Sequence, residues 1–549
     1  MGTSIINVVT CNNCTKNNNN INSENELLKI KNGEIISIDG SKETFEALKD
    51  NTPLPKNLID VKIQTKDLIQ KRNDDVFKHY KKISSLGSGA FGSVYKVENL
   101  ASNNFRAMKV ISKELIVSGI DEREISNEIK ILSRLDHPNI MKIYEFFEDN
   151  NNFYIITEFC DEGDLAGKMK EEGNFPEIVV KYFMNQVFIA ISYLHSQNVF
   201  HGDLKRENIL LESLNNKNKN LISNLNKNID TKTKNILKNL INYEVKLVDF
   251  GAAKMFTSNK KMSGIIGTTY YCSPEIIDDL YREECDEWAC GILMYILITG
   301  YPPFDGNSEE EIFDKIKNEK VNLNVNEFKK ISKNCKNLIN LLLQKDPEQR
   351  IKAKDALKHP FFLEDLNVND LLIGNSDMTL LTSLKNSSLS KSKFQDAVIA
   401  YIALNFTDKN EEIKIKEIFR RMSTDKSNFL IDINTFINCI MENDVGINED
   451  EAKNIFQNID NDKNGFIEYQ ELVRALTDKK KLLSDINLKE AFEFFDIDNS
   501  NTITWDEIAR VVFQGKEVPE DLMKSFLNEI GKTENDPITF NEFCEMIRK

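Results

Sequence analysis

Asp203, Asn208 and Asp249 stand in two short motifs whose residue types suit phosphoryl transfer. The motif "HGDLKREN" (201–208) places Asp203 as a candidate general base and Lys205 two residues later, where an ammonium could neutralise a transferring phosphate. Asn208 follows, and "DFG" supplies Asp249 behind the apolar run "VKLV". Amide and carboxylate oxygens are ligands that Mg²⁺ accepts. We therefore predict Asp203 and Lys205 as catalytic residues and Asn208 and Asp249 as magnesium ligands.

A glycine-rich stretch, "GSGAFGSV" (87–94), could bring backbone amides close to phosphates. A G-x-G-x-x-G pattern alone also fits a glycine hairpin or a dinucleotide-binding turn, but the latter needs a helix directly after the glycines and Ser93–Val97 is β-like. Lys109 in "AMKV" and Glu128 in "NEIKIL" favour a triphosphate site in which the carboxylate orients the lysine. The predicted ATP-contacting residues are Leu86, Gly87, Ser88, Gly89, Ala90, Phe91, Gly92, Ser93, Val94, Lys109, Glu128, Glu158 and Cys160.

These motifs occur in a fixed order, followed by "GTTYYCSPE" (267–275), Asp286 and Arg350, which we expect to pair with Glu275. Residues of about 80–362 thereby resemble the eukaryotic protein kinase family. The resemblance implies an α+β bilobal fold and, from Lys205 and Thr268, a serine/threonine kinase. It also implies that the enzyme uses ATP and Mg²⁺ and acts on protein substrates, with Thr157 as gatekeeper. Asp164 and Glu207 are similar in position to acids that bind basic residues N-terminal to the target hydroxyl; the alternative is ordinary surface carboxylates.

Gly202 departs from the family, where this position beside the catalytic Asp usually holds an Arg that grips a phosphate on the activation segment. Glycine has no side chain for that contact, yet it takes no part in binding phosphate or Mg²⁺. We therefore predict an active kinase that does not depend on phosphorylation between Asp249 and Glu275.

Calcium-binding chemistry is indicated by a fourfold repeat whose units begin at Ser423, Asp460, Asp496 and Gly531. A 12-residue EF-hand loop places oxygens at positions 1, 3, 5, 7, 9 and 12 around a sharp turn at position 6. "DNDKNGFIEYQE" (460–471) fits this pattern with Gly465 at the turn, and "DIDNSNTITWDE" (496–507) fits it with Asn501 there. The predicted calcium ligands are Asp460, Asp462, Asn464, Phe466, Glu468 and Glu471 in one loop, and Asp496, Asp498, Ser500, Thr502 and Glu507 in the other.

The outer two loops have lost ligands. The first begins with Ser423 and has Asn434 in place of the bidentate carboxylate, and the fourth begins with Gly531 and has Pro537 at position 7. Hydrophobic residues still flank both, so we expect them to serve as folding partners, with loops pairing one with two and three with four.

A kinase domain followed by an amphipathic helix at 393–406 and four EF-hands resembles the calcium-dependent protein kinases of plants and apicomplexan protists. The resemblance implies that residues 376–406 hold the kinase inactive until calcium binds. The alternative is a core helix that merely bridges two domains, since Lys385, Lys391 and Lys393 give the segment little basic character. The expected architecture is a kinase fold followed by an all-α domain. Its parts are a low-complexity N-terminal extension (1–75), a kinase domain (80–362) with an Asn/Lys-rich surface insertion at about 214–243, a junction (363–412), and a calmodulin-like domain (413–549) with EF-hands at about 413–441, 450–479, 486–515 and 521–549.

Composition excludes other classes of protein. A formal net charge of −16 argues against nucleic-acid binding, and no apolar stretch approaches the roughly 18 residues that span a bilayer. Nine scattered Cys suit a reducing compartment, so we expect a cytoplasmic protein. Peripheral membrane attachment is the alternative: the chain begins Met1-Gly2, but Ile6 replaces the Ser or Thr usual in myristoylation signals.

Two other functions remain as alternatives to a calcium-activated kinase. One is a pseudokinase scaffold, which Gly202 and Arg206 favour but which would keep Lys109, Asp203, Asn208 and Asp249 without use. The other is a calcium buffer with a vestigial kinase domain, which the decay of two loops disfavours.

Overall fold

The structure is a computed structural model that divides into two compact units, Met1–Asp50 and Asn51–Lys549. In the first unit, strands β1 (Lys29–Lys31) and β2 (Glu34–Ile36) pair as an antiparallel hairpin. All later elements belong to the second unit. Gly2 and Ile6, and with them the predicted choice on acylation, lie outside the described residues. The described residues are 29–31, 34–36, 68–69, 71–72, 74–89, 92–114, 122–214, 231–257, 261–264, 266–363, 378–386, 392–423, 430–443, 446–513 and 518–548.

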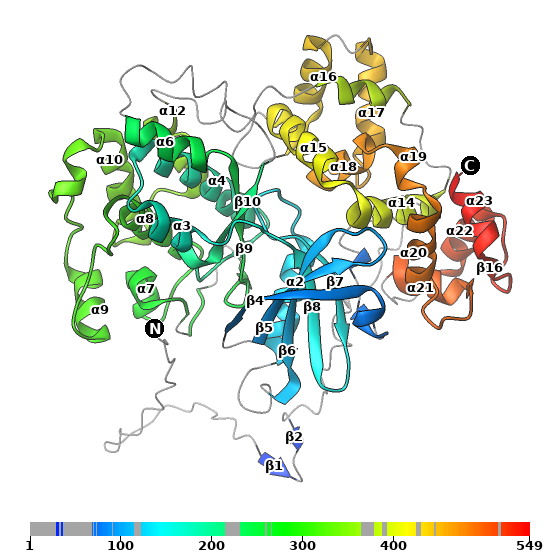
Figure 1. Ribbon diagram of the computed structural model, residues 1–549, viewed down its shortest axis with the longest axis horizontal. Helices are drawn as coiled ribbons and strands as arrows, with labels where there is room; N and C mark the ends of the chain where they lie inside the picture. The colour runs from blue at the N-terminus through cyan, green and yellow to red at the C-terminus, as the bar shows by residue number, and fades with distance from the viewer. Residues whose placement is uncertain are drawn as a thin grey trace. The chain divides into compact units, whose positions relative to one another are not determined.

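The N-terminal lobe of the kinase domain is a sheet that has six strands in the described residues, in the order β3-β7-β8-β6-β5-β4, with helix α2 packed beside it (Figure 1). β3 pairs in parallel with β7, and Leu68 and Val76 are buried. The prediction of a low-complexity extension over residues 1–75 is therefore wrong for its last part, which completes the sheet. The elements are β3 (Lys71–Arg72), β4 (Tyr80–Gly89), β5 (Gly92–Asn99), β6 (Phe105–Ser112), α2 (Glu122–Arg134), β7 (Ile143–Glu148) and β8 (Asn152–Glu158).

The C-terminal lobe is built around two apolar helices, α4 and α8, whose side chains are buried on nearly every face. α4 is also long and apolar enough to cross a membrane by length and composition, contrary to the expectation from sequence, but 89% of that window is buried inside the structure. It is the core helix of the lobe. The helices are α3 (Leu165–Glu172), α4 (Glu177–Ser196), α6 (Thr231–Leu240), α7 (Pro274–Ile277), α8 (Cys285–Thr299), α9 (Glu309–Asn318), α10 (Lys333–Leu342), α11 (Ala353–Ala356) and α12 (Pro360–Leu363), and the strands are β9 (Val199–Phe200), β10 (Ile209–Ser213), β11 (Tyr243–Leu247) and β12 (Lys254–Met255).

The Asn/Lys-rich segment at 214–243 is not only a surface insertion. Its last part forms α6, in which Leu237 and Leu240 are buried, and Ile241 beyond the helix is buried too. The Tyr182 hydroxyl donates a hydrogen bond to the Ile241 carbonyl at 2.9 Å. The prediction of a surface insertion is wrong for this part, because a few Ile and Leu on one helical face suffice for burial once α4 offers an apolar surface. Residues 215–230 lie outside the described residues.

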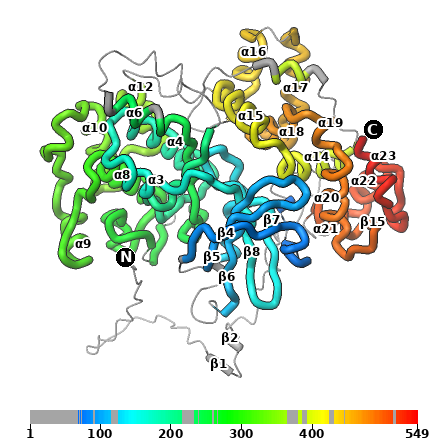
Figure 2. The backbone as a smooth tube through the Cα atoms, in the orientation of Figure 1, coloured from blue at the N-terminus to red at the C-terminus, as the bar shows by residue number. Residues whose placement is uncertain are grey.

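Four helix–loop–helix units follow the junction helix α14 (Lys393–Phe406), as the course of the backbone shows (Figure 2). Short strands join their loops in pairs. β13 pairs with β14 and β15 with β16, which confirms the expected pairing of loops one with two and three with four. The elements are α15 (Lys409–Met422), β13 (Ile431–Asp432), α16 (Ile433–Glu442), α17 (Glu449–Ile459), β14 (Phe466–Ile467), α18 (Tyr469–Leu476), α19 (Lys479–Leu482), α20 (Asp485–Phe495), β15 (Thr502–Ile503), α21 (Trp505–Val512), α22 (Glu520–Ile530), β16 (Ile538–Thr539) and α23 (Phe540–Arg548).

Helix α14 bridges the two domains. Its residues Phe394, Ala397, Val398 and Tyr401 are buried in the hydrophobic core of the third and fourth EF-hands, as their helical spacing predicted. At its other end, Leu404 belongs to a core cluster of the kinase N-terminal lobe. Lys142 donates to the Leu404 carbonyl at 3.0 Å and Arg106 to the Asn405 carbonyl at 3.0 Å, so two cations of the sheet satisfy the last carbonyls of the helix.

A buried charge network joins α15 to the kinase domain. The Lys416 ammonium lies 3.2 Å from Glu212 and 3.4 Å from Glu244, and Arg420 pairs with Glu244. Lys246 pairs with Glu158 at 2.8 Å. Burial alone would lower the pKa of Lys416, but Glu212 and the other carboxylates outweigh that effect and raise it well above its usual range.

We expect Lys416→Met to separate the two domains. The substitution keeps the aliphatic stem but leaves Glu212 and Glu244 buried with too little positive charge, and breaking a buried ion pair costs about 3–5 kcal/mol. Calorimetry of the full chain should then show separate unfolding of the kinase and EF-hand domains. Lys414→Met, on an exposed position of the same helix, is the matched control and should behave as the wild type. A single unshifted transition in Lys416→Met would contradict the role given to this lysine.

Candidate functional site

The glycine-rich stretch is a β-hairpin. β4 and β5 pair with Gly87 opposite Val94, Ser88 opposite Ser93 and Gly89 opposite Gly92. Gly92 has φ +128°, and a Cβ there would lie 2.1 Å from the Val110 carbonyl oxygen, so only glycine fits. A strand follows the glycines rather than a helix, which excludes the dinucleotide-binding turn. Ala90 and Phe91 lie outside the described residues.

Lys109 and Glu128 form the ion pair that sequence reasoning expected. The Lys109 ammonium lies 3.0 and 2.9 Å from the two carboxylate oxygens of Glu128, so β6 and α2 are joined. Burial would lower the pKa of Lys109, but Glu128, helped by Asp249, outweighs it and raises the pKa. The lysine is therefore a fixed positive charge, ready for an anionic ligand.

Three donors surround the Asp203 carboxylate, two from the catalytic loop and one, Thr268, from the activation segment. Lys205 Nζ lies 2.5 Å from Oδ2, Asn208 Nδ2 lies 3.1 Å from Oδ2, and the Thr268 hydroxyl donates to Oδ1 at 2.9 Å. Lys205 also donates to Thr268 at 3.1 Å. Sequence reasoning took Thr268 as an indication of a serine/threonine kinase and missed its contact with Asp203. An aspartate oriented in this way can accept a proton from a hydroxyl group brought to it.

Asn208 and Asp249 lie next to each other through the backbone, because Val248 N donates to the Asn208 carbonyl at 3.1 Å. The Asn208 amide nitrogen is used by Asp203, which leaves its side-chain oxygen for another ligand. One amide oxygen and one carboxylate fit Mg²⁺, which prefers hard oxygen donors. Phe250 is buried and packs on His201 with ring centroids 4.9 Å apart, which holds the "DFG" segment in place.

Asp286 anchors the catalytic loop from below. Its carboxylate accepts from His201 N at 2.8 Å, from Gly202 N at 3.0 Å and from His195 Nε2 at 3.0 Å. Burial would lower the pKa of His195, but Glu287 and Asp286 raise it to about 10, so the imidazole is a cation. The expected pair of Arg350 with Glu275 is present, with two hydrogen bonds of 2.5 and 3.0 Å.

Gly202 occupies a left-handed backbone position with φ +79°. A Cβ there would lie 3.0 Å from the Ala252 carbonyl oxygen and 3.1 Å from Ile266, so a side chain would be strained and crowded. The surrounding surface is apolar. The core cluster there contains Phe200, Cys272, Ile276, Tyr281 and Cys285, against which Phe256, Met262 and Ile266 of the activation segment pack.

Glu158 lies at the hinge between the two lobes, and its backbone rather than its side chain is available for contact with a nucleotide. Its side chain is buried against Lys246 and Lys416, and its N–H donates to the Lys142 carbonyl at 2.9 Å. The Glu158 carbonyl and Cys160 remain as candidates for nucleotide contact.

The second and third EF-hand loops each gather three carboxylates. Ligand oxygens of Asp460, Asp462 and Glu471 lie within 4.8 Å of one another, and so do those of Asp496, Asp498 and Glu507. Gly465 and Asn501 take left-handed φ values of +86° and +63° at the turn, as the EF-hand geometry needs. Burial, the Glu468 carboxylate and Asp462 raise the pKa of Glu471 to about 8, and the backbone N–H groups of Glu468 and Asn461 offset this only in part. A cation of high charge and oxygen preference fits both donor sets.

Comparison with known proteins agrees with this geometry. A family model for a protein kinase domain matches residues 80–223 and 227–362, and one for an EF-hand domain pair matches residues 449–512 and 485–548. Calcium-dependent protein kinase 4 of Plasmodium falciparum (isolate 3D7) is 32% identical over 528 residues, which cover 93% of this chain and 95% of that protein.

The chain belongs to the calcium-dependent protein kinase family. Calcium-dependent protein kinase 5 of the same organism is 30% identical over 88% of this chain and 80% of that protein, and calcium-dependent protein kinase 2 of Zea mays is 29% identical over 88% of each. The predicted family, fold class, enzyme class and cofactors (ATP, Mg²⁺ and Ca²⁺) are confirmed.

In the fourth EF-hand of this calcium-dependent protein kinase, a lysine side chain of the loop itself contacts the loop oxygens. The Lys532 ammonium lies 2.6 Å from Glu542 Oε1 and 3.4 Å from the Pro537 carbonyl oxygen, the position-12 and position-7 oxygens of the loop. Lys532 and the Thr539 backbone lower the pKa of Glu542 to about 2. The Lys532 ammonium thus contacts two of the oxygens that would bind a calcium ion in an intact loop. In the first loop, Asn434 offers no carboxylate, and residues 424–429 lie outside the described residues.

We expect calcium to bind at the second and third loops and not at the fourth. Calorimetric titration of the full chain with Ca²⁺ should lose one binding event in Glu471→Gln and the other in Glu507→Gln, because each removes the bidentate ligand. Glu542→Gln, the equivalent change in the fourth loop, is the matched control and should leave the stoichiometry unchanged. Loss of a calcium ion in Glu542→Gln would contradict the assignment of Lys532.

Proposed function

We propose that this calcium-activated serine/threonine protein kinase uses Asp203 as the base for the substrate hydroxyl and is released from inhibition when calcium binds its second and third EF-hands. The observation that carries the proposal is the combination of an assembled Asp203–Lys205–Thr268 network and a formed Lys109–Glu128 pair with two tri-carboxylate loops in one chain.

The residues of the cleft divide the chemistry among them. Lys109, oriented by Glu128, binds and neutralises the phosphates of ATP. Asp203 accepts the proton of the attacking hydroxyl while Lys205 balances charge on the phosphoryl group that is transferred. Asn208 and Asp249 would hold Mg²⁺, which would further neutralise the phosphate oxygens. The glycine hairpin covers the phosphates with backbone amides.

Helix α14 is the element through which we propose that calcium acts. Here it lies in the core of the third and fourth EF-hands, with Phe394 packed on Phe495, Phe526 and Phe543. An EF-hand lobe that holds this apolar helix withdraws it from any inhibitory position, and the lobe's affinity for it rises with calcium. By linkage, calcium shifts the equilibrium toward the assembled kinase.

The acidic residues near the catalytic loop suggest a preference for basic substrates. Glu207 is 46% exposed and contacts Arg206. Asp164 caps α3 by accepting from Gly167 N at 2.7 Å, and one carboxylate can accept further donors. We propose Glu207 as the main contact for a basic residue N-terminal to the target hydroxyl, in proteins of the cytoplasm.

The decisive experiment measures phosphate transfer from Mg-ATP to a basic serine peptide by the full chain, with calcium and with a chelator. We expect transfer that calcium stimulates. Transfer that is equal in both states would overturn calcium control, and no transfer in either state would favour the pseudokinase scaffold or the calcium buffer.

Asp203→Asn should abolish most of this activity, by about 10²-fold or more in kcat, because the amide cannot accept the hydroxyl proton. Asp314→Asn, an exposed aspartate of α9, is the control and should retain wild-type turnover. Calcium titration of the Asp203→Asn protein should stay normal. Near wild-type turnover in Asp203→Asn would remove Asp203 from the mechanism.

Phosphorylation of the activation segment should not be needed. Alanine at Thr257, Ser258, Ser263 and Thr269 together should leave calcium-stimulated activity largely intact, because apolar packing around Gly202 holds the segment. Ile266→Ser should instead lower activity, since it removes apolar contact from that cluster. A collapse of activity in the four-alanine variant, with Ile266→Ser unaffected, would refute this account of the switch.

A further inference from the structure

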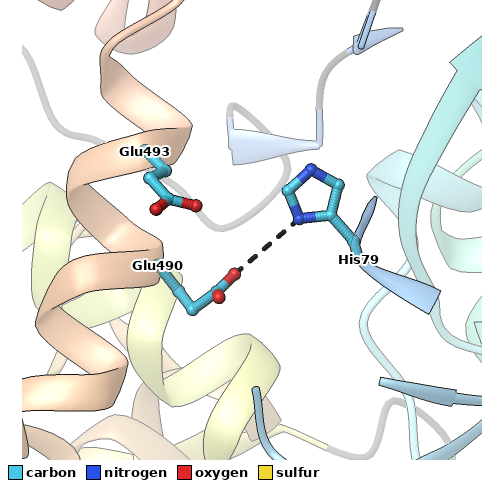
Figure 3. A group of neighbouring side chains, drawn as sticks. All are labelled: His79, Glu490 and Glu493. Atoms are coloured by element: carbon cyan, nitrogen blue, oxygen red, sulfur yellow. Dashed lines mark ion pairs between the residues drawn. The ribbon is translucent and has the colours of Figure 1, made fainter. Parts of the chain in front are cut away.

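Three side chains that are not part of the kinase cleft or of an EF-hand loop converge between the two domains. His79 stands just before β4 in the kinase N-terminal lobe, and Glu490 and Glu493 lie one turn apart on α20, the entering helix of the third EF-hand. Ligand atoms of the three residues lie within 4.8 Å of one another. Figure 3 shows the imidazole facing the helix, with Glu490 nearest to it.

The contacts of His79 determine which ring nitrogen faces α20. Nε2 lies 2.5 Å from Asp74 Oδ2 and 2.9 Å from Arg72 NH2, and Arg72 also pairs with Asp74 and with Glu145. Because Nε2 is occupied by these contacts, Nδ1 is the nitrogen that faces α20.

Nδ1 lies 3.9 Å from Glu490 Oε2, so a ring nitrogen and two carboxylates point at one small volume. Within the part of the chain that the structure describes, Glu490 has no other ion-pair partner, and Glu493 has an exposed one, Lys489, at 3.7 Å. Burial and the neighbouring Glu493 raise the pKa of Glu490, and His79 and Arg72 offset this only in part. His79 is buried, with 9% of its surface exposed, whereas the side chains of Glu490 and Glu493 are 23% and 40% exposed, so the group opens toward solvent on the side of α20. A ring nitrogen and two carboxylates in this arrangement favour a bound cation.

We propose that His79, Glu490 and Glu493 bind a Zn²⁺ ion that joins the kinase domain to the third EF-hand. One imidazole nitrogen and two carboxylate oxygens with a water molecule as fourth ligand form a tetrahedral set that zinc accepts. Ca²⁺ and Mg²⁺ prefer oxygen ligands alone, so the imidazole selects against the cations of the other sites.

The surroundings match a zinc site in two further respects. Zinc–ligand bonds of about 2.0–2.2 Å place neighbouring ligand atoms roughly 3.4 Å apart. His79 Nδ1 and Glu490 Oε2 are now 3.9 Å apart and all three ligand atoms lie within 4.8 Å of one another, so rotations of the two glutamate side chains can close the set. The Asp74 carboxylate accepts from the other imidazole nitrogen, the arrangement by which proteins fix the orientation of a metal-binding histidine. Because the ligands come from both domains, zinc binds only when the domains are docked and so stabilises the docked arrangement.

The test uses the full chain with Cys11→Ser and Cys14→Ser, which removes the C-x-x-C pair of the N-terminal tail, in saturating Ca²⁺ and excess Mg²⁺. Co²⁺ is the spectroscopic probe, and Zn²⁺ is titrated by calorimetry. We expect one equivalent to bind, with the intense visible absorption of four-coordinate cobalt and no thiolate charge-transfer band. His79→Gln and Glu490→Gln should each weaken binding by about tenfold or more, and Asp74→Asn by about 10–100-fold without changing the type of spectrum.

Glu520→Gln, an exposed glutamate of the neighbouring helix α22, is the matched control and should leave binding unchanged. Circular dichroism checks the fold of each variant, and Glu493→Gln, at a more exposed position, serves if His79→Gln does not fold. Affinity that is the same in His79→Gln and Glu490→Gln would overturn the proposal. Loss of Co²⁺ binding in Asp496→Asn, with His79→Gln unchanged, would also overturn it, because the ion would then occupy the third EF-hand loop. A protein that binds no Co²⁺ would overturn it as well.

Discussion

The docking of the two domains depends on a charge balance that neither of them satisfies alone. On the kinase side, Glu158, Glu212 and Glu244 are buried around a single ammonium, that of Lys246, which leaves two negative charges. Helix α15 supplies three positive charges through Lys409, Lys416 and Arg420 and adds one carboxylate, Glu412, so that its net contribution is two positive charges. Buried carboxylates without counter-charges cost free energy. The carboxylates on β10 and β11 therefore favour the state in which α15 is docked over the state in which the two domains are apart. Because Glu158 also ends β8 at the hinge, the EF-hand domain is tied to the segment that borders the nucleotide site.

The catalytic machinery is held by a second set of contacts that converge on the backbone around Gly202. Asp286 binds the amides of His201 and Gly202 from the C-terminal lobe, while Thr268 reaches Asp203 from the activation segment. Lys109 and Glu128 join the sheet to α2, and Asn127 of α2 donates to the Ala253 carbonyl at 2.9 Å. Polar contacts to the backbone and apolar packing thus stabilise the assembled state.

Sequence reasoning predicted several contacts and loop geometries of the candidate site because the residues concerned lie in short motifs with local chemical meaning. The Lys109–Glu128 and Arg350–Glu275 pairs, the glycine hairpin, the two carboxylate loops and the pairing of EF-hands were all readable in this way. The misses share a physical cause. Lys416, Lys532 and α6 look like ordinary surface positions, and their partners lie far away in sequence or depend on backbone geometry. Burial of Leu237 or Lys416 is decided by what packs against it, which no local pattern contains.

Lys532 in the fourth EF-hand bears on how steeply kinase activity rises with calcium concentration. The tethered ammonium of Lys532 is present at every calcium concentration. If calcium binds only at the second and third loops, as proposed above, each lobe holds one ion and coupling between the ions has to pass between lobes, for which α14 offers a route because it packs on both α18 and α20. Since the Hill coefficient cannot exceed the number of coupled sites, this chain is suited to a graded dose–response rather than an abrupt threshold.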